Sequence, residues 1–152
     1  MKITVENLKK SFGDRCIWSG IDLTFTSDEI VSIAGKSGQG KTTFLRCLNG
    51  LETYDDGKVS FDGTLMPAGT TDAKKIGMVF QGYSLFPKMT VWENILLAPI
   101  YHGVDRKEAE ERAERLMKEL EIYEEKDKYP RNLSGGQQQR VAIVRACMLE
   151  PE

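Results

Sequence analysis

Residues 35–43, GKSGQGKTT, decide the fold of this chain. They follow the apolar run IVSIA at 30–34 and precede FLRCL at 44–48, which predicts a buried strand that turns into a helix. Glycines at such a turn let successive backbone N–H groups point inward and form a nest for an anion. Lys41 adds a mobile positive charge for outer phosphates, and Thr42 adds a hydroxyl for Mg²⁺. The spacing of Gly35, Gly40, Lys41 and Thr42 therefore predicts a nucleoside triphosphate site.

Other interpretations of this loop can be weighed on spacing. A glycine-rich turn without a ligand would have the same strand, loop and helix, and it remains open as the alternative. The dinucleotide fingerprint does not fit, because Thr43 stands where that motif needs Gly or Ala and Lys41 has no role in it.

The composition is that of an ordinary soluble chain. With 152 residues, 40% of them hydrophobic, the sequence predicts one domain or part of one. A net charge of −2 without a basic block disfavours nucleic acid as a partner. The N-terminal MKITVENLKK lacks the apolar core of a signal peptide, so we expect a cytoplasmic protein. Cys16, Cys47 and Cys147 have no paired spacing, which disfavours a disulfide framework and zinc, and we expect His102 in a solvated loop.

The N-terminal half alternates as strands do. Segments 3–8 and 20–26 predict half-buried strands, joined by a polar turn over 9–20 that carries Phe12 and Trp18. Phe12 lies just ahead of the loop, where it either stacks on a base or packs against the fold. The continuous apolar character of 30–34 predicts a strand buried on both faces, at the centre of a parallel sheet.

Two further strands are predicted before the helices begin. Strand 58–61 turns at Asp62-Gly63 into a small antiparallel hairpin, so Asp62 is interpreted as a turn residue and not as a metal ligand. Strand 75–80, KIGMVF, ends at Gln81, on the ligand side of an open α/β sheet. The Gln81 amide could reach a metal-bound oxygen or an attacking water, or simply cap the strand.

From residue 90 onward the pattern is helical. Thr90 and Glu93 form a capping box for a helix over 91–97, which Pro99 is expected to end. Asp105 and Glu108 repeat the device for a helix to about residue 121. Ion pairs four residues apart are expected on its solvated face, and its apolar residues share the other face. The pairs are Glu108–Arg112 and Glu111–Arg115, and the apolar residues are Ala109, Ala113, Leu116, Met117 and Leu120.

The last predicted helix, 135–149, starts unusually. Ser134 caps it, but Gly135 and Gly136 each weaken a helix by about 1 kcal/mol relative to alanine, so they need a reason. Close approach of the backbone to an anionic ligand is one, and a flexible hinge is the other. A chain with phosphate-facing helix ends at both 41 and 134 suggests a site shared between two copies.

These motifs together resemble those of ATP-binding cassette (ABC) ATPases. GKSGQGKTT resembles the Walker A loop, VFQ ending at Gln81 the Q-loop, and LSGGQQQR at 133–140 the signature motif. SLFPKMTVWENILLAP and the Tyr-Pro before the signature look most like subunits that energise polar amino-acid importers. The resemblance implies an α/β P-loop NTPase core with an antiparallel β arm and a helical subdomain. It implies one partial domain over 1–152, divided into arm and core (1–89), helical subdomain (90–133) and signature helix (134–152).

The resemblance also implies a role for each residue that matches a motif. Lys41 and Gln81 would serve catalysis, Thr42 and Gln81 would address Mg²⁺, and Phe12 would stack on the base of ATP. The residues that would contact the nucleotide are Phe12, Gly35, Lys36, Ser37, Gly38, Gln39, Gly40, Lys41, Thr42 and Thr43. Those that would face the γ-phosphate on the opposite copy of a head-to-tail dimer are Ser134, Gly135, Gly136 and Gln137.

The family's partners and its remaining motifs complete the expectation. Helices from Thr90 would receive the membrane permease subunits, with the chain at the inner face of the cell membrane. Walker B, the catalytic glutamate, the D-loop and the switch histidine would all follow Glu152. We therefore expect ATP binding with hydrolysis lost or slowed, an open sheet edge and low solubility. A non-catalytic nucleotide-binding or interaction module remains the alternative; a soluble ABC ATPase of DNA repair or translation is disfavoured by the lack of basic character.

Overall fold

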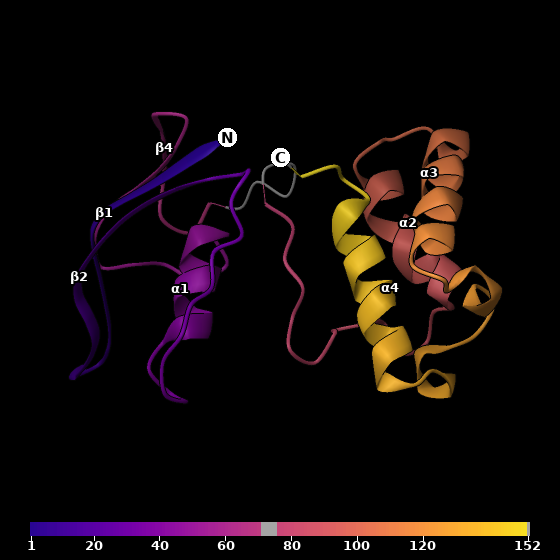
Figure 1. The fold of residues 1–152 in the computed structure, drawn as a ribbon, viewed down its shortest axis with the longest axis horizontal. Coiled ribbons are helices and arrows are strands. Elements are labelled where there is room, and N and C mark those ends of the chain that lie inside the picture. The colour runs from indigo at the N-terminus through magenta and orange to yellow at the C-terminus, as the bar shows by residue number, and fades with distance from the viewer. Residues whose placement is uncertain (71–75, 152) are drawn as a thin grey trace. The chain divides into compact units, whose positions relative to one another are not determined.

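The computed structural model describes residues 1–70 and 76–151 (Figure 1). It divides into two compact units, Met1–Ala73 and Lys74–Pro151, and each unit is described by itself. The division into arm and core, helical subdomain and signature helix remains a prediction.

The first unit is built on an antiparallel sheet of four strands in the order β2-β1-β3-β4. The strands are β1 (Lys2–Phe12), β2 (Arg15–Thr26), β3 (Asp56–Phe61) and β4 (Thr64–Met66). The predicted strands 3–8 and 20–26 are confirmed, but the predicted turn over 9–20 is wrong. Phe12 pairs with Arg15 across the ladder, and the turn is confined to residues 13–14, with Gly13 at φ 56°. The polar residues that suggested a loop lie within paired strands, where they need no burial.

The hairpin predicted around Asp62-Gly63 is confirmed. Asp62 and Gly63 have φ values of 48° and 80°, the left-handed pair that a tight hairpin turn requires, and they join β3 to β4. The Asp62 carboxylate accepts a hydrogen bond of 2.7 Å from the backbone N–H of Lys2. Asp62 is therefore a turn residue that also ties β1 to the hairpin.

The strands predicted on either side of the phosphate-loop motif do not form. Residues 30–34 are not part of any strand, and Ile30 and Val31 are exposed, so the prediction of a central parallel strand is wrong for this structure. Residues 76–80 likewise do not form a strand, and Lys75 lies outside the described residues. An apolar run records a tendency to be buried, but a strand exists only where a neighbour satisfies its N–H and C=O groups. Within residues 1–70 and 76–151, the antiparallel sheet is the sheet that forms.

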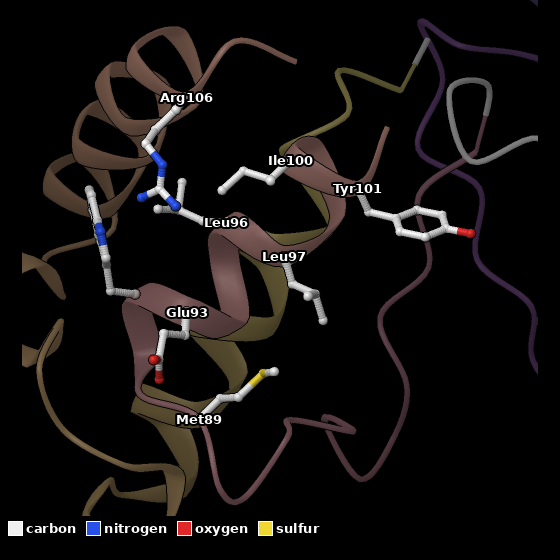
Figure 2. Close-up of a pocket in the computed structure, with 8 residues that line it drawn as sticks. Met89, Glu93, Leu96, Leu97, Ile100, Tyr101 and Arg106 are labelled. Carbon is white, nitrogen blue, oxygen red and sulfur yellow. The ribbon is translucent and has the colours of Figure 1, made fainter. Parts of the chain in front are cut away.

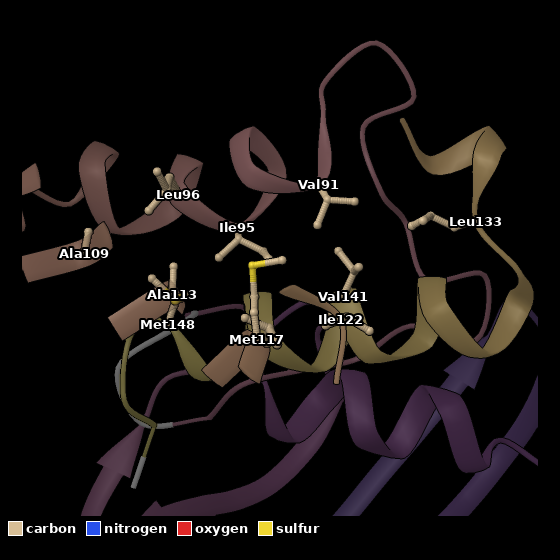
Figure 3. Packing of buried hydrophobic residues seen from close by; sticks show 11 residues of the cluster. Val91, Ile95, Leu96, Ala109, Ala113, Met117, Ile122, Leu133, Val141 and Met148 are labelled. Carbon is tan, nitrogen blue, oxygen red and sulfur yellow. The ribbon is translucent and has the colours of Figure 1, made fainter. Parts of the chain in front are cut away.

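The second unit is a helical cluster. It contains α2 (Val91–Tyr101), α3 (Arg106–Glu119), α4 (Gly135–Cys147) and short 3₁₀ turns at Tyr123–Glu125 and Pro130–Asn132. Figure 3 shows side chains from the three α-helices pointing into a common core. Ala109, Ala113 and Met117 of α3 are fully buried there, so the predicted apolar face is confirmed.

The sequence predicted the start of α2 correctly but not its end. Thr90 and Glu93 form the predicted capping box, with the Glu93 carboxylate 2.7 Å from the Thr90 N–H. The expected end at Pro99 is wrong, because α2 continues to Tyr101 with Pro99 inside it. Proline removes one backbone hydrogen bond, but Pro99 is itself buried and follows the buried Ile95 and Leu96, so α2 continues past it.

Only part of the capping box predicted for α3 forms. Asp105 accepts from the N–H groups of Lys107 and Glu108, but the Glu108 carboxylate binds Arg112 at 2.8 Å instead of returning to the cap. The predicted Glu108–Arg112 pair is thus confirmed. Glu111 lies 4.0 Å from Lys107 and not in the expected pair with Arg115.

Candidate functional site

The motif at 35–43 forms a loop that closes on itself through Lys41. The Lys41 ammonium donates to the backbone carbonyls of Gly35 at 2.7 Å and Lys36 at 2.8 Å. The Gln39 side chain accepts a hydrogen bond of 2.9 Å from the Lys36 N–H. These three hydrogen bonds close the loop into a ring, and the Lys41 ammonium lies across it. Phosphate oxygens carry more charge than backbone carbonyls, so they can replace these partners of the ammonium.

Glycine is required at position 40 for two separate reasons. Its φ of 85° lies in the left-handed region, and a Cβ placed there would meet Ile17 Cγ2 at 2.3 Å and Trp18 Nε1 at 2.8 Å. The Trp18 ring also packs edge-on against Phe44 of α1 (Lys41–Leu48), with centroids 5.9 Å apart. Strand β2 therefore braces the point where the loop becomes a helix.

The start of α1 provides backbone donors. Gly40 is the N-cap and has no side chain to accept from the first turn, and the first helical hydrogen bond runs from Phe44 N–H to Gly40 C=O at 2.8 Å. The N–H groups of Lys41, Thr42 and Thr43 precede that bond, so they are donors that the helix itself does not use. Together with the ammonium and the exposed Thr42 hydroxyl, this donor set fits a phosphate chain and its Mg²⁺ ion.

Phe12 lies at the end of β1 with about half of its side chain exposed. The Lys10 ammonium lies 4.5 Å from the centre of its ring. An aromatic ring this exposed is available to a planar ligand, and packing alone does not account for it.

Gln81 belongs to the second unit, where it is exposed in a turn. Tyr83 and Ser84, directly after it, are held in the left-handed region at φ 59° and 50°. The Arg145 guanidinium of α4 donates to both of their carbonyls, at 2.9 Å and 2.8 Å. Burial lowers the pKa of Arg145. Sequence reasoning missed Arg145, since nothing in its helical surroundings signals a partner 61 residues earlier.

The signature segment forms a helix N-terminus with a complete capping box. Ser134 Oγ accepts from Gln137 N–H at 3.3 Å, and Gln137 Oε1 accepts from Ser134 N–H at 2.8 Å. The Gln137 amide also donates to Glu125 at 3.1 Å. Apart from its chain neighbours and the nearby backbone of its own helix, no atom of the described residues lies within 4 Å of a Cβ built at Gly136. Internal packing therefore gives no reason for glycine at 136, and the space above it is open.

The predicted site residues fall on both units. Phe12 and residues 35–43 belong to the first, and Gln81 with residues 134–137 to the second.

The second unit also carries a groove of about 500 Å³ on α2 (Figure 2). Its walls are mainly apolar, with Glu93 from α2 and Arg106 from the start of α3 as charged groups. The remaining lining residues are Met89, Trp92, Leu96, Leu97, Ile100 and Tyr101. Sequence reasoning placed a partner-binding region on these helices without finding the groove.

Among residues 1–70 and 76–151, none of the helices has the length and apolar character needed to cross a membrane.

The loop at 35–43 has the glycines, the lysine and the helix start that are typical of nucleotide-binding proteins. Residues 18–152 match the family model described as ABC transporter, and the chain belongs to this family. The predicted resemblance and its fold class, an ABC-type P-loop NTPase with an antiparallel β arm and helices, are thereby confirmed.

Relatives and solved structures agree with this assignment. The chain is 44% identical over 155 residues to the arginine transport ATP-binding protein ArtM of Bacillus subtilis, covering 99% of this chain and 65% of ArtM. It is 44% identical over 158 residues to the general L-amino acid transport ATP-binding protein AapP of Rhizobium johnstonii, covering 99% and 60%. It matches the dimeric structure of MJ0796, a bacterial ABC transporter cassette, at 33% identity and a TM-score of 0.86, covering 98% of this chain and 70% of that one. The chain thus spans 60–65% of the length of these two curated relatives.

Proposed function

We propose that this chain binds Mg²⁺-ATP and supplies the ATP-binding part of an importer of polar amino acids. The observation that carries the proposal is the loop at 35–43, in which Lys41 bridges the carbonyls of Gly35 and Lys36 at the start of α1. The relatives' names, which include arginine, glutamine and glutamate transport, support an amino acid as the solute.

The nucleotide contacts follow from the geometry of the first unit. Lys41 would move from the loop carbonyls to the outer phosphates, while the N–H groups at the start of α1 bind the same oxygens. Thr42 offers its exposed hydroxyl to Mg²⁺, and the exposed ring of Phe12 offers a surface to the base. When bound, the metal neutralises phosphate charge. In the second unit, the exposed Gln81 amide is proposed as the further group for the metal or for a water molecule.

A second nucleotide contact is proposed at the start of α4. Ser134 and the open backbone at Gly136 would face the γ-phosphate held by a second copy or a second ABC subunit, in a head-to-tail dimer. The similarity to a dimeric cassette structure supports a dimer.

The groove on α2 is proposed as the docking surface for the permease. Its apolar walls suit the apolar face of a short helix, and Glu93 and Arg106 offer opposite charges for orientation. Such a partner would hold the chain at the inner face of the cell membrane.

The test is equilibrium binding of Mg²⁺-ATP to the chain, with Lys41→Ala as the control and phosphate release followed in the same samples. We expect saturable binding that Lys41→Ala abolishes. Binding without phosphate release would show that the site binds ATP but does not hydrolyse it without further groups, and binding unchanged in Lys41→Ala would refute the proposed site.

A further inference from the structure

Lys10 stands out in the first unit because it is a lysine with only 5% of its surface exposed. A buried ammonium is costly unless it is paired, and Lys10 is paired with the Glu52 carboxylate at 2.9 Å. Leu8 and Lys10 are both buried, so Lys10 lies on the inward side of β1, although the ladder to β2 shifts register between Leu8 and Lys9. An apolar residue would be the simpler choice there, which means that the charge needs a reason.

The Phe12 ring supplies one. Lys10 and Phe12 lie two residues apart on β1, and the Lys10 ammonium sits over the ring at 4.5 Å from its centre. A cation over one face of a ring is attracted to the π electrons and restricts the ring's rotation. About half of the Phe12 side chain is exposed, so ring surface remains for a ligand.

Glu52 connects this arrangement to the phosphate loop. The backbone N–H groups of Leu51 and Glu52 both donate to the carbonyl of Arg46, at 2.9 Å and 3.2 Å. Arg46 lies in the last turn of α1, the helix that the phosphate loop opens. The chain of contacts therefore runs from the ring through Lys10 and Glu52 to α1.

We propose that Lys10, held by Glu52, is a positioning residue that fixes the Phe12 ring as a platform for the purine base of the nucleotide. This inference rests on the proposed function, in which Phe12 stacks on the base. The cation also draws electron density from the ring, which lowers the repulsion between stacked π faces. Removing the Lys10 charge should weaken the binding of the base and leave the binding of the phosphates unchanged.

The experiment compares two ligands, Mg²⁺-ATP and Mg²⁺-tripolyphosphate, which share the phosphate chain but differ in the nucleoside. Phe12→Ala tests the proposed function and should weaken the binding of ATP by roughly 5- to 150-fold, the range of base–aromatic stacking, without weakening the binding of tripolyphosphate. Lys10→Met tests the inference and should weaken ATP by about 2- to 5-fold, with tripolyphosphate unchanged. Lys9→Met is the matched control, since Lys9 is also on β1 but pairs with the exposed Asp56, and we expect it to change neither affinity.

Two double variants separate positioning from a purely structural role. Lys10→Met with Glu52→Gln removes both charges and leaves no unpaired carboxylate. It should show the same loss for ATP, and it replaces the single variant if Lys10→Met does not fold. Lys10→Met with Phe12→Ala should bind ATP no more weakly than Phe12→Ala alone, because the lysine acts through the ring.

The outcomes distinguish the two proposals. An unchanged preference for ATP in Phe12→Ala, or no binding of either ligand by the unsubstituted chain, overturns the proposed base site and the inference with it. If Phe12→Ala weakens ATP alone as expected, the proposed base site stands. The inference about Lys10 is then overturned if Lys10→Met keeps full ATP affinity, weakens the binding of both ligands equally, or regains ATP affinity when Glu52→Gln is added.

Discussion

Gly40→Ala and Gly38→Ala form a matched pair that tests how the phosphate loop is held. Both glycines have left-handed φ values, 77° at Gly38 and 85° at Gly40. A Cβ at Gly38 meets no described atom within 4 Å outside its chain neighbours, whereas at Gly40 it meets Ile17 at 2.3 Å and Trp18 at 2.8 Å. The two variants therefore share the backbone strain but differ in the clash.

The expected costs follow from these distances. The left-handed conformation costs alanine about 1–2 kcal/mol, and the smaller entropy of its unfolded chain returns about 0.4–1 kcal/mol. Gly38→Ala should thus lower the free energy of unfolding by about 1 kcal/mol. Gly40→Ala adds overpacking of about 1–3 kcal/mol against β2, and the total reaches about 2–4 kcal/mol.

Urea unfolding followed by Trp fluorescence measures both free energies, and titration with Mg²⁺-ATP measures the consequence for binding. We expect Gly40→Ala to lose more stability and more ATP affinity than Gly38→Ala. Equal unfolding midpoints and equal affinities in the two variants would show that the contact with Ile17 and Trp18 does not constrain the loop.

Three other results are expected. Burial raises the pKa of Cys47 to about 11, so at pH 8 only about one thiol in a thousand is ionised; iodoacetamide should modify the exposed Cys16 first, and equal rates in the folded chain would contradict this. Met117→Ala removes a fully buried side chain of the helical core and should lower the free energy of unfolding in urea by about 2–5 kcal/mol; a loss below 1 kcal/mol would mean that the core collapses around the site. Arg145→Met removes both donors to the segment after Gln81, so hydrogen exchange should accelerate at Ser84 while the centre of α4 keeps its protection, and unchanged exchange would refute the restraint.

The helical half of the chain was the more predictable from sequence. The capping box at Thr90, the N-cap at Ser134 and the apolar face of α3 all depend on contacts within a few residues, which the sequence displays directly. The end of α2 was not predictable in this way. Pro99 breaks a helix by local rules, yet burial of α2 against the core carries the helix past it.

The strands were less predictable from sequence than the helices. The hairpin at Asp62-Gly63 was predictable because its turn chemistry is local, but the fate of 30–34 was not, because a strand needs a partner that its own residues do not specify. The same reason explains the long β1–β2 ladder, in which polar residues that suggested a loop are paired across the sheet.

For the candidate site, the sequence by itself determined the chemistry: a glycine-rich loop with Lys41 and Thr42 at the start of a helix, and the glycines that open α4. The tertiary structure alone decided what surrounds these groups. Ile17 and Trp18 fill the space beside Gly40, Lys10 lies over Phe12, and Arg145 holds the carbonyls after Gln81. Motifs are visible in sequence because their geometry is local, whereas these supporting contacts join residues that only the fold brings together.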